Sequence, residues 1–341
     1  MISHDEKPAP LKETDIRPEH LMAEQARLFA QDVSRLLARK DEFVRVACPA
    51  CGSDVSKKVF EKQGFLYDKC DRCGTIFINP RPTPEILNEY YETSENYTYW
   101  NKVLFPASEQ TRRERIFRPR VDKVLEFCNK FGVSYDTFLE VGAGFGTFCE
   151  ELRDRKVFRR IIAVEPTPGL AESCRSRNLE VIPDTIERVQ LPEESVDVIA
   201  SFEVVEHLFH PADFVTQCLR FLKPGGIVFL TCPNGKGFEI ATLRQFAQSV
   251  DPEHQNYFNP DSLSLLLSER GLRILEVATP GKLDAELVRK RVLSGELDLS
   301  GQPFLKTVLV EEWDRLGEKF QTFLADNGLS SHMWIVARKE R

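Results

Sequence analysis

The stretch TFLEVGAGFGTFCE, from Thr137 to Glu150, constrains the fold more than any other part of the chain. Its first residues are apolar and strand-prone, and its last residues begin a helical pattern, so Gly142, Gly144 and Gly146 lie in the turn between them. Glycine permits backbone angles that are closed to other residues, and the first N–H groups of a helix are free. The stretch therefore predicts a buried strand followed by a nucleotide-binding turn.

The spacing of these glycines distinguishes two classes of nucleotide site. The dinucleotide fingerprint G-x-G-x-x-G would place its third glycine at position 147, whereas this chain has it at Gly146. The resulting G-x-G-x-G, preceded by an acid, resembles motif I of the class I S-adenosylmethionine-dependent methyltransferases. By this resemblance, the residues that would bind S-adenosylmethionine here are Glu140, Gly142, Ala143, Gly144, Phe145 and Gly146.

The resemblance continues along the following strands. An apolar run at 161–164 ends in Glu165, which stands where the family has the acid that binds both ribose hydroxyls; an acid at this distance also suits a dehydrogenase. A short strand at 179–182 precedes the turn that lies beside the adenine in the family, although Asp184 is equally explained as a cap. The further cofactor contacts implied in this way are Pro166, Asp184, Thr185, Ile186, Phe202 and Glu203.

Two later segments complete the resemblance and predict the fold. EVVEHL, at 203–208, and LKPGG, at 222–226, resemble small-molecule methyltransferases, including the ubiquinone-biosynthesis O-methyltransferase group. The implied fold is a doubly wound α/β domain with a seven-stranded, mostly parallel sheet and one antiparallel strand. Such a sheet binds ligands beyond the carboxyl ends of its strands. The remaining strands are expected at 196–199, 227–230, 273–278 and 333–337.

Four of the nine cysteines form two matched C-x-x-C pairs that are separated by eighteen residues. This spacing predicts a tetrahedral zinc site with four thiolate ligands, and a closed site of that kind is structural because it leaves no position for water. A redox-active pair is the alternative. The predicted ligands are Cys48, Cys51, Cys70 and Cys73.

A region rich in aromatic and basic residues connects the two modules. Its first part, from Ile76 to Trp100, resembles the segment that joins an amino-terminal zinc ribbon to the methyltransferase domain in bacterial enzymes of sugar and polysaccharide modification. The aromatic residues form either a lid over the substrate or part of the core. The arginines that follow are either a solvated face or a clamp for an anionic group; they are Arg112, Arg113, Arg115, Arg118 and Arg120.

Histidine supplies the candidate catalytic groups, because a hydroxyl acceptor must lose its proton near neutral pH. His207, in EVVEHL, and His254, in DPEHQNYF, are the candidate bases or substrate ligands, and His210 is a weaker one. His207 could equally fix its own loop by a hydrogen bond. An amine or an activated carbon as acceptor would need no strong base.

The domain boundaries follow from these assignments. Residues 1–44 are expected to form an arm, disordered to about residue 17, and an amphipathic helix; residues 45–80 form the zinc ribbon. Residues 81–132 form the linker, lid and leading helix. Residues 133–341 form the methyltransferase domain, with a helical insertion at about 282–328 that covers the substrate or makes a homodimer. Helical patterns within the insertion lie near 283–293 and 304–324.

The net charge and the distribution of apolar residues limit the classes of function that the chain can have. The net charge of -7 argues against a broad nucleic-acid surface, and the chain has no membrane-length apolar run and no apolar signal segment near its start, so a cytoplasmic location is expected. The predicted function is methyl transfer to a small polar acceptor, most simply a nucleotide-linked sugar or glycan precursor. The alternatives are an RNA-base methyltransferase that holds RNA with the ribbon, an NAD-dependent dehydrogenase, and a non-catalytic zinc-stabilised binding module.

Overall fold

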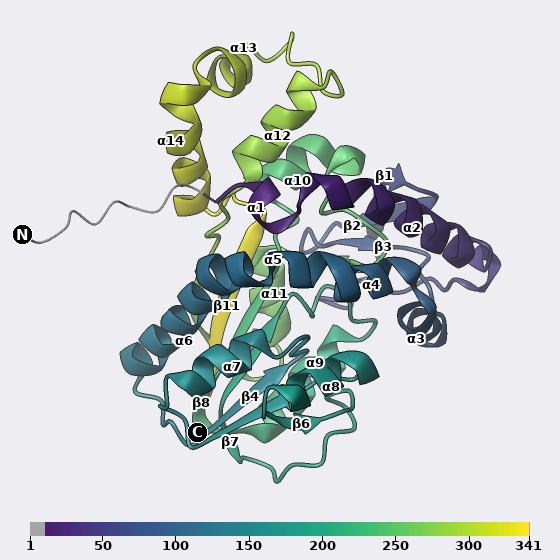
Figure 1. The fold of residues 1–341 in the computed structure, drawn as a ribbon. Helices are drawn as coiled ribbons and strands as arrows, with labels where there is room; N and C mark the ends of the chain where they lie inside the picture. Colours follow the sequence, from purple (N-terminus) through teal and green to yellow (C-terminus); the bar gives the residue numbers. More distant parts are fainter. Residues whose placement is uncertain (1–10, 341) are drawn as a thin grey trace, which may run out of the picture.

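The structure, a computed structural model, describes residues 11–340 and contains two β-sheets (Figure 1). The larger sheet has seven strands in the order β10-β11-β8-β7-β4-β5-β6. Only β11 runs antiparallel to its neighbours, so the predicted seven-stranded, mostly parallel sheet is confirmed. Its strands are β4 (Thr137–Val141), β5 (Arg160–Val164), β6 (Glu180–Ile182), β7 (Val196–Phe202), β8 (Leu222–Pro233), β10 (Leu272–Ala278) and β11 (His332–Lys339).

Helices surround both sheets and connect them. The described α-helices are α1 (Glu13–Ile16), α2 (Glu19–Leu37), α3 (Pro84–Thr93), α4 (Glu95–Tyr99), α5 (Phe105–Arg112), α6 (Arg118–Phe131), α7 (Thr147–Asp154), α8 (Pro168–Ser176), α9 (Pro211–Phe221), α10 (Phe238–Leu243), α11 (Pro260–Ser268), α12 (Asp284–Leu293), α13 (Pro303–Lys306) and α14 (Trp313–Asp326). Several begin at residues that suit a helix start: Asn259 caps α11 through its side chain, and Pro260 occupies the first helical position.

The alternation of strand side chains gives the large sheet a helical layer on each face. On one face, Phe138 of β4 and Phe229 of β8 pack in a cluster that includes α6 and α7. On the other face, Leu139 and Leu230, from the same two strands, pack in a cluster that includes α9 and α11. A sheet covered on both faces leaves its carboxyl edge as the place for a ligand.

The smaller sheet is antiparallel, has the order β1-β2-β3-β9, and joins the cysteine-rich segment to the main domain. Strands β1 (Ser56–Lys62), β2 (Phe65–Cys70) and β3 (Ile76–Ile78) come from the predicted ribbon. The fourth strand, β9 (Asn256–Tyr257), belongs to the loop that carries His254 and pairs with β3. The ribbon therefore shares a sheet with the main domain, which the sequence analysis did not anticipate.

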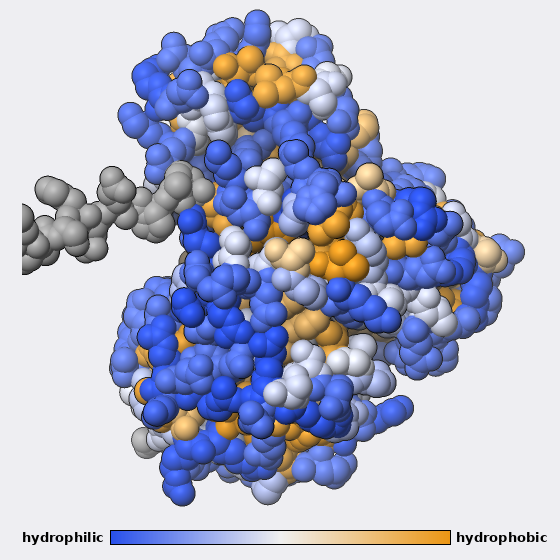
Figure 2. Space-filling model, in the orientation of Figure 1, coloured by the Kyte–Doolittle hydropathy of each residue, from blue (hydrophilic) through white to orange (hydrophobic). Residues whose placement is uncertain are grey.

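A continuous helical rod lies over the large sheet. Residues 95–131 are helical without a break, because the π-helical turns at Trp100–Leu104 and Arg113–Phe117 link α4, α5 and α6. Figure 1 shows this rod running across the middle of the molecule, above α7 and α8. Figure 2 shows apolar side chains gathered where the rod meets the lower body.

The helical insertion is helical in both regions where helical patterns were expected, near 283–293 and 304–324, and the second region is divided. There α13 passes into a π-helical turn, Thr307–Glu311, and the chain bends before α14 begins at Trp313. Leu309 of this turn and Val288 of α12 are buried in one cluster with Ile240 of α10 and with residues of the ribbon and α2. The insertion therefore shares a hydrophobic core with the ribbon, at the top of the view in Figure 1.

The amino-terminal arm also differs in part from expectation. Residues 1–10 lie outside the described part of the chain, but residues 13–16 form α1 within the segment expected to be disordered. Glu13 is buried and its carboxylate lies 3.0 Å from Lys290 Nζ of α12. Contact with the insertion stabilises this turn, and a long-range contact of this kind leaves no local sequence signal. Within residues 11–340, no helix is long and apolar enough to span a bilayer.

We expect the free energy of unfolding to depend on pH through Glu239 of α10, which is 3% exposed. One of its carboxylate oxygens accepts a hydrogen bond from Ser249 Oγ at 3.1 Å, and the other has no partner among residues 11–340. Burial raises the pKa of Glu239 from 4.5 to about 7. The folded chain keeps this proton at pH values where the unfolded chain has lost it, so stability decreases as pH rises from 4.5 to 7.

The substitution Glu239→Gln removes this dependence, because an amide does not ionise. Urea unfolding at pH 5 and pH 8 should show that E239Q gains about 2–3 kcal/mol relative to wild type over this interval. The matched control is Glu172→Gln on α8, at a side chain that is 72% exposed, and it should show no gain. An equal pH dependence in wild type and E239Q would contradict the prediction.

Candidate active site

The three glycines after β4 have different roles in one turn. All have positive φ angles, +76° at Gly142, +55° at Gly144 and +75° at Gly146. A Cβ at Gly142 would lie 2.4 Å from Val204 Cγ2, and one at Gly146 would lie 2.7 Å from Leu179 Cδ1, whereas a Cβ at Gly144 would have no neighbour within 4 Å. The outer glycines therefore allow close packing, and the middle one opens space beside the backbone.

Glu165, directly after β5, is fixed beside this open space. Its Oε2 accepts a hydrogen bond from Gly144 N at 2.8 Å, and its Oε1 accepts one from Thr167 N at 2.9 Å. Its carboxyl group is 4% exposed, and burial raises its pKa. A carboxylate held in this way can accept hydrogen bonds from the hydroxyls of a sugar ring, so the open turn and Glu165 fit a nucleoside-type cofactor such as S-adenosylmethionine. Pro166 follows on the surface.

Glu140 and Phe145 have different surroundings at the turn. Glu140 is buried beneath it and accepts a hydrogen bond from Cys149 Sγ at 2.9 Å; burial raises its pKa to about 8. Ala143 is also buried. The ring of Phe145 stacks on Phe105 of α5, with centroids 3.8 Å apart and planes 7° apart. The helical rod therefore contacts the glycine turn directly.

The turn after β6 contains the predicted adenine contacts. The Asp184 carboxylate accepts a hydrogen bond from Thr185 N at 2.8 Å, and Ile186 is 3% exposed within the main core. The bond to Thr185 N agrees with a local turn-forming role of Asp184. An adenine contact of these residues stays a prediction.

The end of β7 brings Phe202 and Glu203 close to a partly buried arginine. The Arg120 guanidinium lies 4.5 Å from the centre of the Phe202 ring and 3.6 Å from Glu203 Oε1. Glu203 also accepts hydrogen bonds from Thr231 Oγ1 at 2.6 Å and His332 Nε2 at 2.9 Å. Burial opposes ionisation of Glu203, but the charges of His332 and Arg120 and the hydrogen bonds from His332 and Thr231 together outweigh it and lower the pKa. Arg120 thus belongs to the site and not to a solvated face.

The other arginines of this helical rod have structural partners. Arg113 bridges Glu109, Glu150 and Glu151, and Arg118 bonds to Glu151. Arg112 stacks on Trp100 at 5.2 Å. These contacts hold the rod on α7.

The two candidate catalytic histidines lie together, with ring centroids 4.7 Å apart. His207 Nδ1 lies 3.2 Å from Tyr91 Oη and 3.0 Å from the Glu253 carbonyl oxygen. Burial, together with the charge of His254, lowers the pKa of His207 to about 4. Burial opposes protonation of His254 as well, but Asp251, Glu206 and the Ser249 carbonyl group together outweigh it and raise the pKa of His254 to about 10. His210 is exposed before α9 and contacts Phe209 instead.

Aromatic residues of α3 and α4 cover this position. Besides the contact of Tyr91 with His207, Tyr90 donates a hydrogen bond to Glu253 Oε1 at 2.6 Å. Burial, with the nearby carboxylate of Glu165, raises the pKa of Tyr97. The segment therefore lies over both the histidines and the cofactor acid, as a lid would.

The four predicted metal ligands also converge. Cys48 Sγ lies 3.5 Å from Cys73 Sγ, and Cys51 Sγ lies 3.6 Å from Cys70 Sγ. The four sulfurs all lie within 4.8 Å of one another. Sulfurs around a tetrahedral zinc ion, with Zn–S bonds near 2.3 Å, are about 3.8 Å apart, so the cluster fits zinc.

Sequence reasoning missed several members of the site. Glu206 is fully buried beside the histidines, and Asp251 and Glu253 flank His254. The spacing of Glu203, Glu206 and His207 within EVVEHL was a signal that could have indicated a cluster. Tyr91 was expected in a lid, but its partner His207 could not be read from the sequence.

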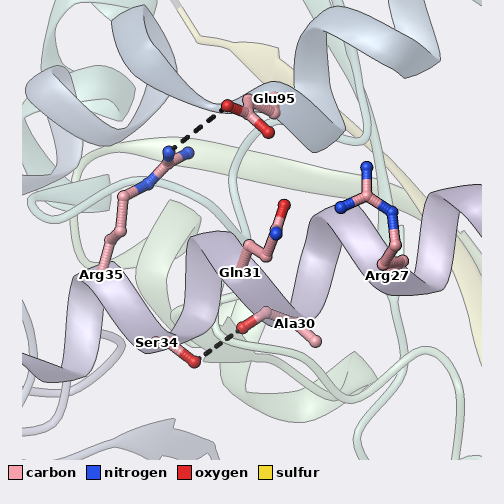
Figure 3. Close-up of a pocket in the computed structure, with 6 residues that line it drawn as sticks. All are labelled: Arg27, Ala30, Gln31, Ser34, Arg35 and Glu95. Carbon is pink, nitrogen blue, oxygen red and sulfur yellow. Dashed lines mark hydrogen bonds and ion pairs between the residues drawn. The ribbon is translucent and has the colours of Figure 1, made fainter.

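A separate surface depression lies between α2 and α4 (Figure 3). Arg35 reaches across it to Glu95 at 3.7 Å, and Ser34 Oγ bonds to the Ala30 carbonyl oxygen. The side chains that line it include none of the predicted site residues.

The middle of the chain is similar to known methyltransferases. Residues 109–277 match the family model of a methyltransferase domain. A "probable S-adenosylmethionine-dependent methyltransferase" of Mycolicibacterium smegmatis is 30% identical over 138 residues, 40% of this chain and 51% of that protein. A ubiquinone biosynthesis O-methyltransferase of Bradyrhizobium diazoefficiens is 27% identical over 176 residues, 48% of this chain and 67% of that protein. The solved structure of an S-adenosylmethionine-dependent methyltransferase from Clostridium acetobutylicum has a TM-score of 0.48 at 12% identity, over 71% of this chain and 99% of its own.

The similarity to a methyltransferase domain concerns residues 109–277. It includes the glycine turn, Glu165 and both histidines, whereas the cysteine cluster lies outside it. The chain spans about half the length of the first of these relatives. Residues 109–277 therefore match a methyltransferase domain, and the relatives that are similar to this part of the chain carry the name of S-adenosylmethionine-dependent methyltransferases.

Proposed function

We propose that the chain transfers a methyl group from S-adenosylmethionine to a small polar acceptor. The observation that carries this proposal is the Glu165 carboxylate, fixed by two backbone N–H groups beside the open space at Gly144. The spacing of the glycine turn supports S-adenosylmethionine over a dinucleotide. An NAD-dependent dehydrogenase and a non-catalytic binding module are the less favoured alternatives.

Bound S-adenosylmethionine supplies an electrophilic methyl group on a positively charged sulfur. The chain contributes position: the turn and Glu165 hold one end of the cofactor, and the aromatic lid excludes water from the carboxyl edge of the sheet. Orientation alone contributes several kcal/mol to a displacement in which nucleophile, carbon and leaving group must align. The face of Phe202, near the end of β7, suits a neighbouring cation.

The acceptor is proposed to lie between the lid and the pair formed by His207 and His254. Aromatic rings such as Tyr91 suit the face of a sugar, and the partly buried Arg120 suits an anionic group, which supports a nucleotide-linked sugar or glycan precursor. The ubiquinone biosynthesis O-methyltransferase relative favours an oxygen as the accepting atom. RNA-base methylation is the alternative acceptor class, and the net charge of -7 disfavours it.

The cysteine cluster is proposed to hold a structural zinc ion. Thiolates of this kind persist in a reducing compartment, which supports the proposed cytoplasmic location. A homodimer stays a prediction, and its candidate contact is the exposed apolar surface of the insertion, where Phe304 is 69% and Phe323 is 52% exposed. Part of this surface is visible over α13 at the top of Figure 2.

Glu165→Gln tests the cofactor site. The amide keeps the size of the side chain but carries no charge and replaces one acceptor oxygen by a donor, so we expect the dissociation constant of S-adenosylmethionine to increase about tenfold to a hundredfold. Isothermal titration calorimetry measures it, with the exposed Glu172→Gln as the matched control. Wild-type affinity in E165Q would contradict the assignment, and tight binding of NAD by the wild-type chain would favour the dehydrogenase.

Loss of the metal should disturb the histidine loop through the strand pair β3–β9. In Cys70→Ser we expect less than one zinc ion per chain and faster hydrogen exchange at residues 249–257, measured by metal analysis and mass spectrometry. S-adenosylmethionine binding should change little, because Glu165 lies outside the smaller sheet. Cys218→Ala, a buried cysteine of α9 outside the cluster, is the control and should retain its zinc. Full zinc content in C70S would refute the ligand assignment.

The acceptor class can be tested without knowing the acceptor. Labelled S-adenosylmethionine is incubated with the full chain and a cell extract, which is then separated into RNA and small-molecule fractions. We expect label in the small molecules, with none in a heat-killed control. Label in RNA would overturn the proposed acceptor class and would favour RNA binding by the ribbon.

A further inference from the structure

His332, the first residue of β11, lies at the edge of the large sheet where the other strands end. It pairs with Pro233, the last residue of β8, because β11 runs antiparallel to β8. Of the seven strands described, β11 alone brings its first residue to this carboxyl edge. Ligands of such sheets bind beyond that edge, so His332 lies on the ligand side of the domain.

The imidazole of His332 is paired with a carboxylate. Its Nε2 lies 2.9 Å from Oε1 of Glu203, at the end of β7. An ionised carboxylate only accepts hydrogen bonds, so Nε2 carries the proton of the neutral ring and Nδ1 keeps its lone pair. Within residues 11–340, Nδ1 of His332 makes no hydrogen bond, and the side chain is 34% exposed. A ligand can therefore reach the nitrogen that accepts a proton.

The carboxylate of Glu203 is held in a strained but supported position. Its backbone has a φ angle of +56°, in the left-handed region that disfavours a residue with a side chain. Glu203 N donates a hydrogen bond to the Thr231 carbonyl oxygen at 3.1 Å, and Thr231 Oγ1 donates one to Glu203 Oε1 at 2.6 Å. Arg120 Nη2 lies 3.6 Å from the same oxygen. Backbone strain that is retained in this way is typical of functional sites.

The pair lies one strand away from the proposed cofactor turn, because β7 is the neighbour of β4. Val204, which follows Glu203, packs against the turn so closely that a Cβ at Gly142 would lie 2.4 Å from Val204 Cγ2. Phe202, which precedes Glu203, packs on Phe148 of α7, with ring centroids 4.6 Å apart. The residues on both sides of Glu203 therefore contact the segment that would hold the methyl donor.

The chain just before His332 is fixed by the helical insertion. The Asp284 carboxylate of α12 accepts hydrogen bonds from Ser331 N and Ser330 Oγ. On the other side, Asn234 N donates to the Ser331 carbonyl oxygen at 2.8 Å, and Asn234 Nδ2 donates to the Ser330 carbonyl oxygen at 2.9 Å. The imidazole is thus carried on a rigid turn, and a group held in position before the reaction contributes to its rate.

The other two histidines of the site are less suited to accept a proton. Burial lowers the pKa of His207 to about 4, so its ring is a weak base. The pKa of His254 is raised to about 10 despite burial, mainly by Asp251, so its ring is already protonated at neutral pH. A general base works best when it is neutral at the operating pH and is not much weaker than that pH requires. His207 and His254 are left as groups that hold the acceptor.

We propose that His332 is the general base that takes the proton of an acceptor hydroxyl. The inference rests on the proposed methyl transfer and adds that the accepting atom is oxygen. As the hydroxyl oxygen forms a bond to the methyl carbon, its proton passes to Nδ1 of His332. The carbon–sulfur bond breaks with its electron pair left on sulfur, so the positive charge of the sulfonium ends on the imidazolium, beside the carboxylate of Glu203. The partly exposed ring then releases the proton to water.

Rescue by imidazole tests this assignment. Labelled S-adenosylmethionine is incubated with the full chain and the small-molecule fraction of a cell extract, and only the labelled product that the wild-type chain forms is counted. We expect His332→Ala to form it at least about a hundredfold more slowly, and added imidazole to raise that rate at least about tenfold. Imidazole should not stimulate the wild type. The matched control is His20→Ala, at an exposed histidine of α2, which should keep the wild-type rate.

A second variant and a binding measurement complete the test. His332→Gln fills the space of the ring without a basic nitrogen, so it should be as slow as H332A and should gain nothing from imidazole. Calorimetry should give wild-type affinity for S-adenosylmethionine in both variants, because the ring lies three strands from the glycine turn. If H332A does not bind the cofactor, H332Q decides alone, through its rate.

The outcomes separate this inference from the function on which it rests. A wild-type rate in either variant, or a slow H332A that binds the cofactor and is not restored by imidazole, would overturn the role of His332 and leave methyl transfer standing. No labelled product from a wild-type chain that binds S-adenosylmethionine would refute the proposed function and this inference together.

Discussion

The arrangement of the histidine side of the site depends on the hydrogen bonds of one buried residue, Asn256. Its backbone pairs with Phe77 of β3, its Oδ1 accepts a bond from Arg81 Nη1 at 2.9 Å, and its Nδ2 donates to the carbonyl oxygen of Leu208. The cysteine-bearing sheet, the start of the lid and the EVVEHL loop thus meet at a single side chain. Because all these groups are buried, breaking one bond would leave others unsatisfied, so the three segments are held in place together.

Through this junction the ribbon supports the loop that carries His254, although the ribbon itself contributes no side chain to the candidate active site. Its metal would fix the turns that carry β2 and β3, and β3 fixes β9 and the loop with His254. The cofactor side is built differently, because the glycine turn and Glu165 depend on parallel strands of the large sheet and on local backbone bonds. The two halves of the site therefore have separate supports, and tyrosines of α3 and α4 lie near both.

Much of the fold and of the cofactor side was predictable from the sequence, since both depend on local patterns. Apolar runs marked all seven strands, the glycine spacing marked the turn, and paired C-x-x-C motifs marked the four ligands that converge. The histidine side was predicted only as separate residues. His207 and His254 are far apart in the chain, and neither the pairing of β9 with β3 nor the burial of Glu206 leaves a local pattern.

The sequence by itself determined the domain class, the position of the nucleotide turn and the identity of the thiolate ligands, because each rests on residue type at short spacing. Tertiary structure alone decided that Arg120 enters the site, that Tyr91 contacts His207, and that Glu206 is buried beside two imidazoles. The physical reason is that burial and charge pairing are properties of surroundings. The residues of EVVEHL are the same whether water or the protein interior surrounds them, and only the packed fold buries the carboxyl group of Glu206.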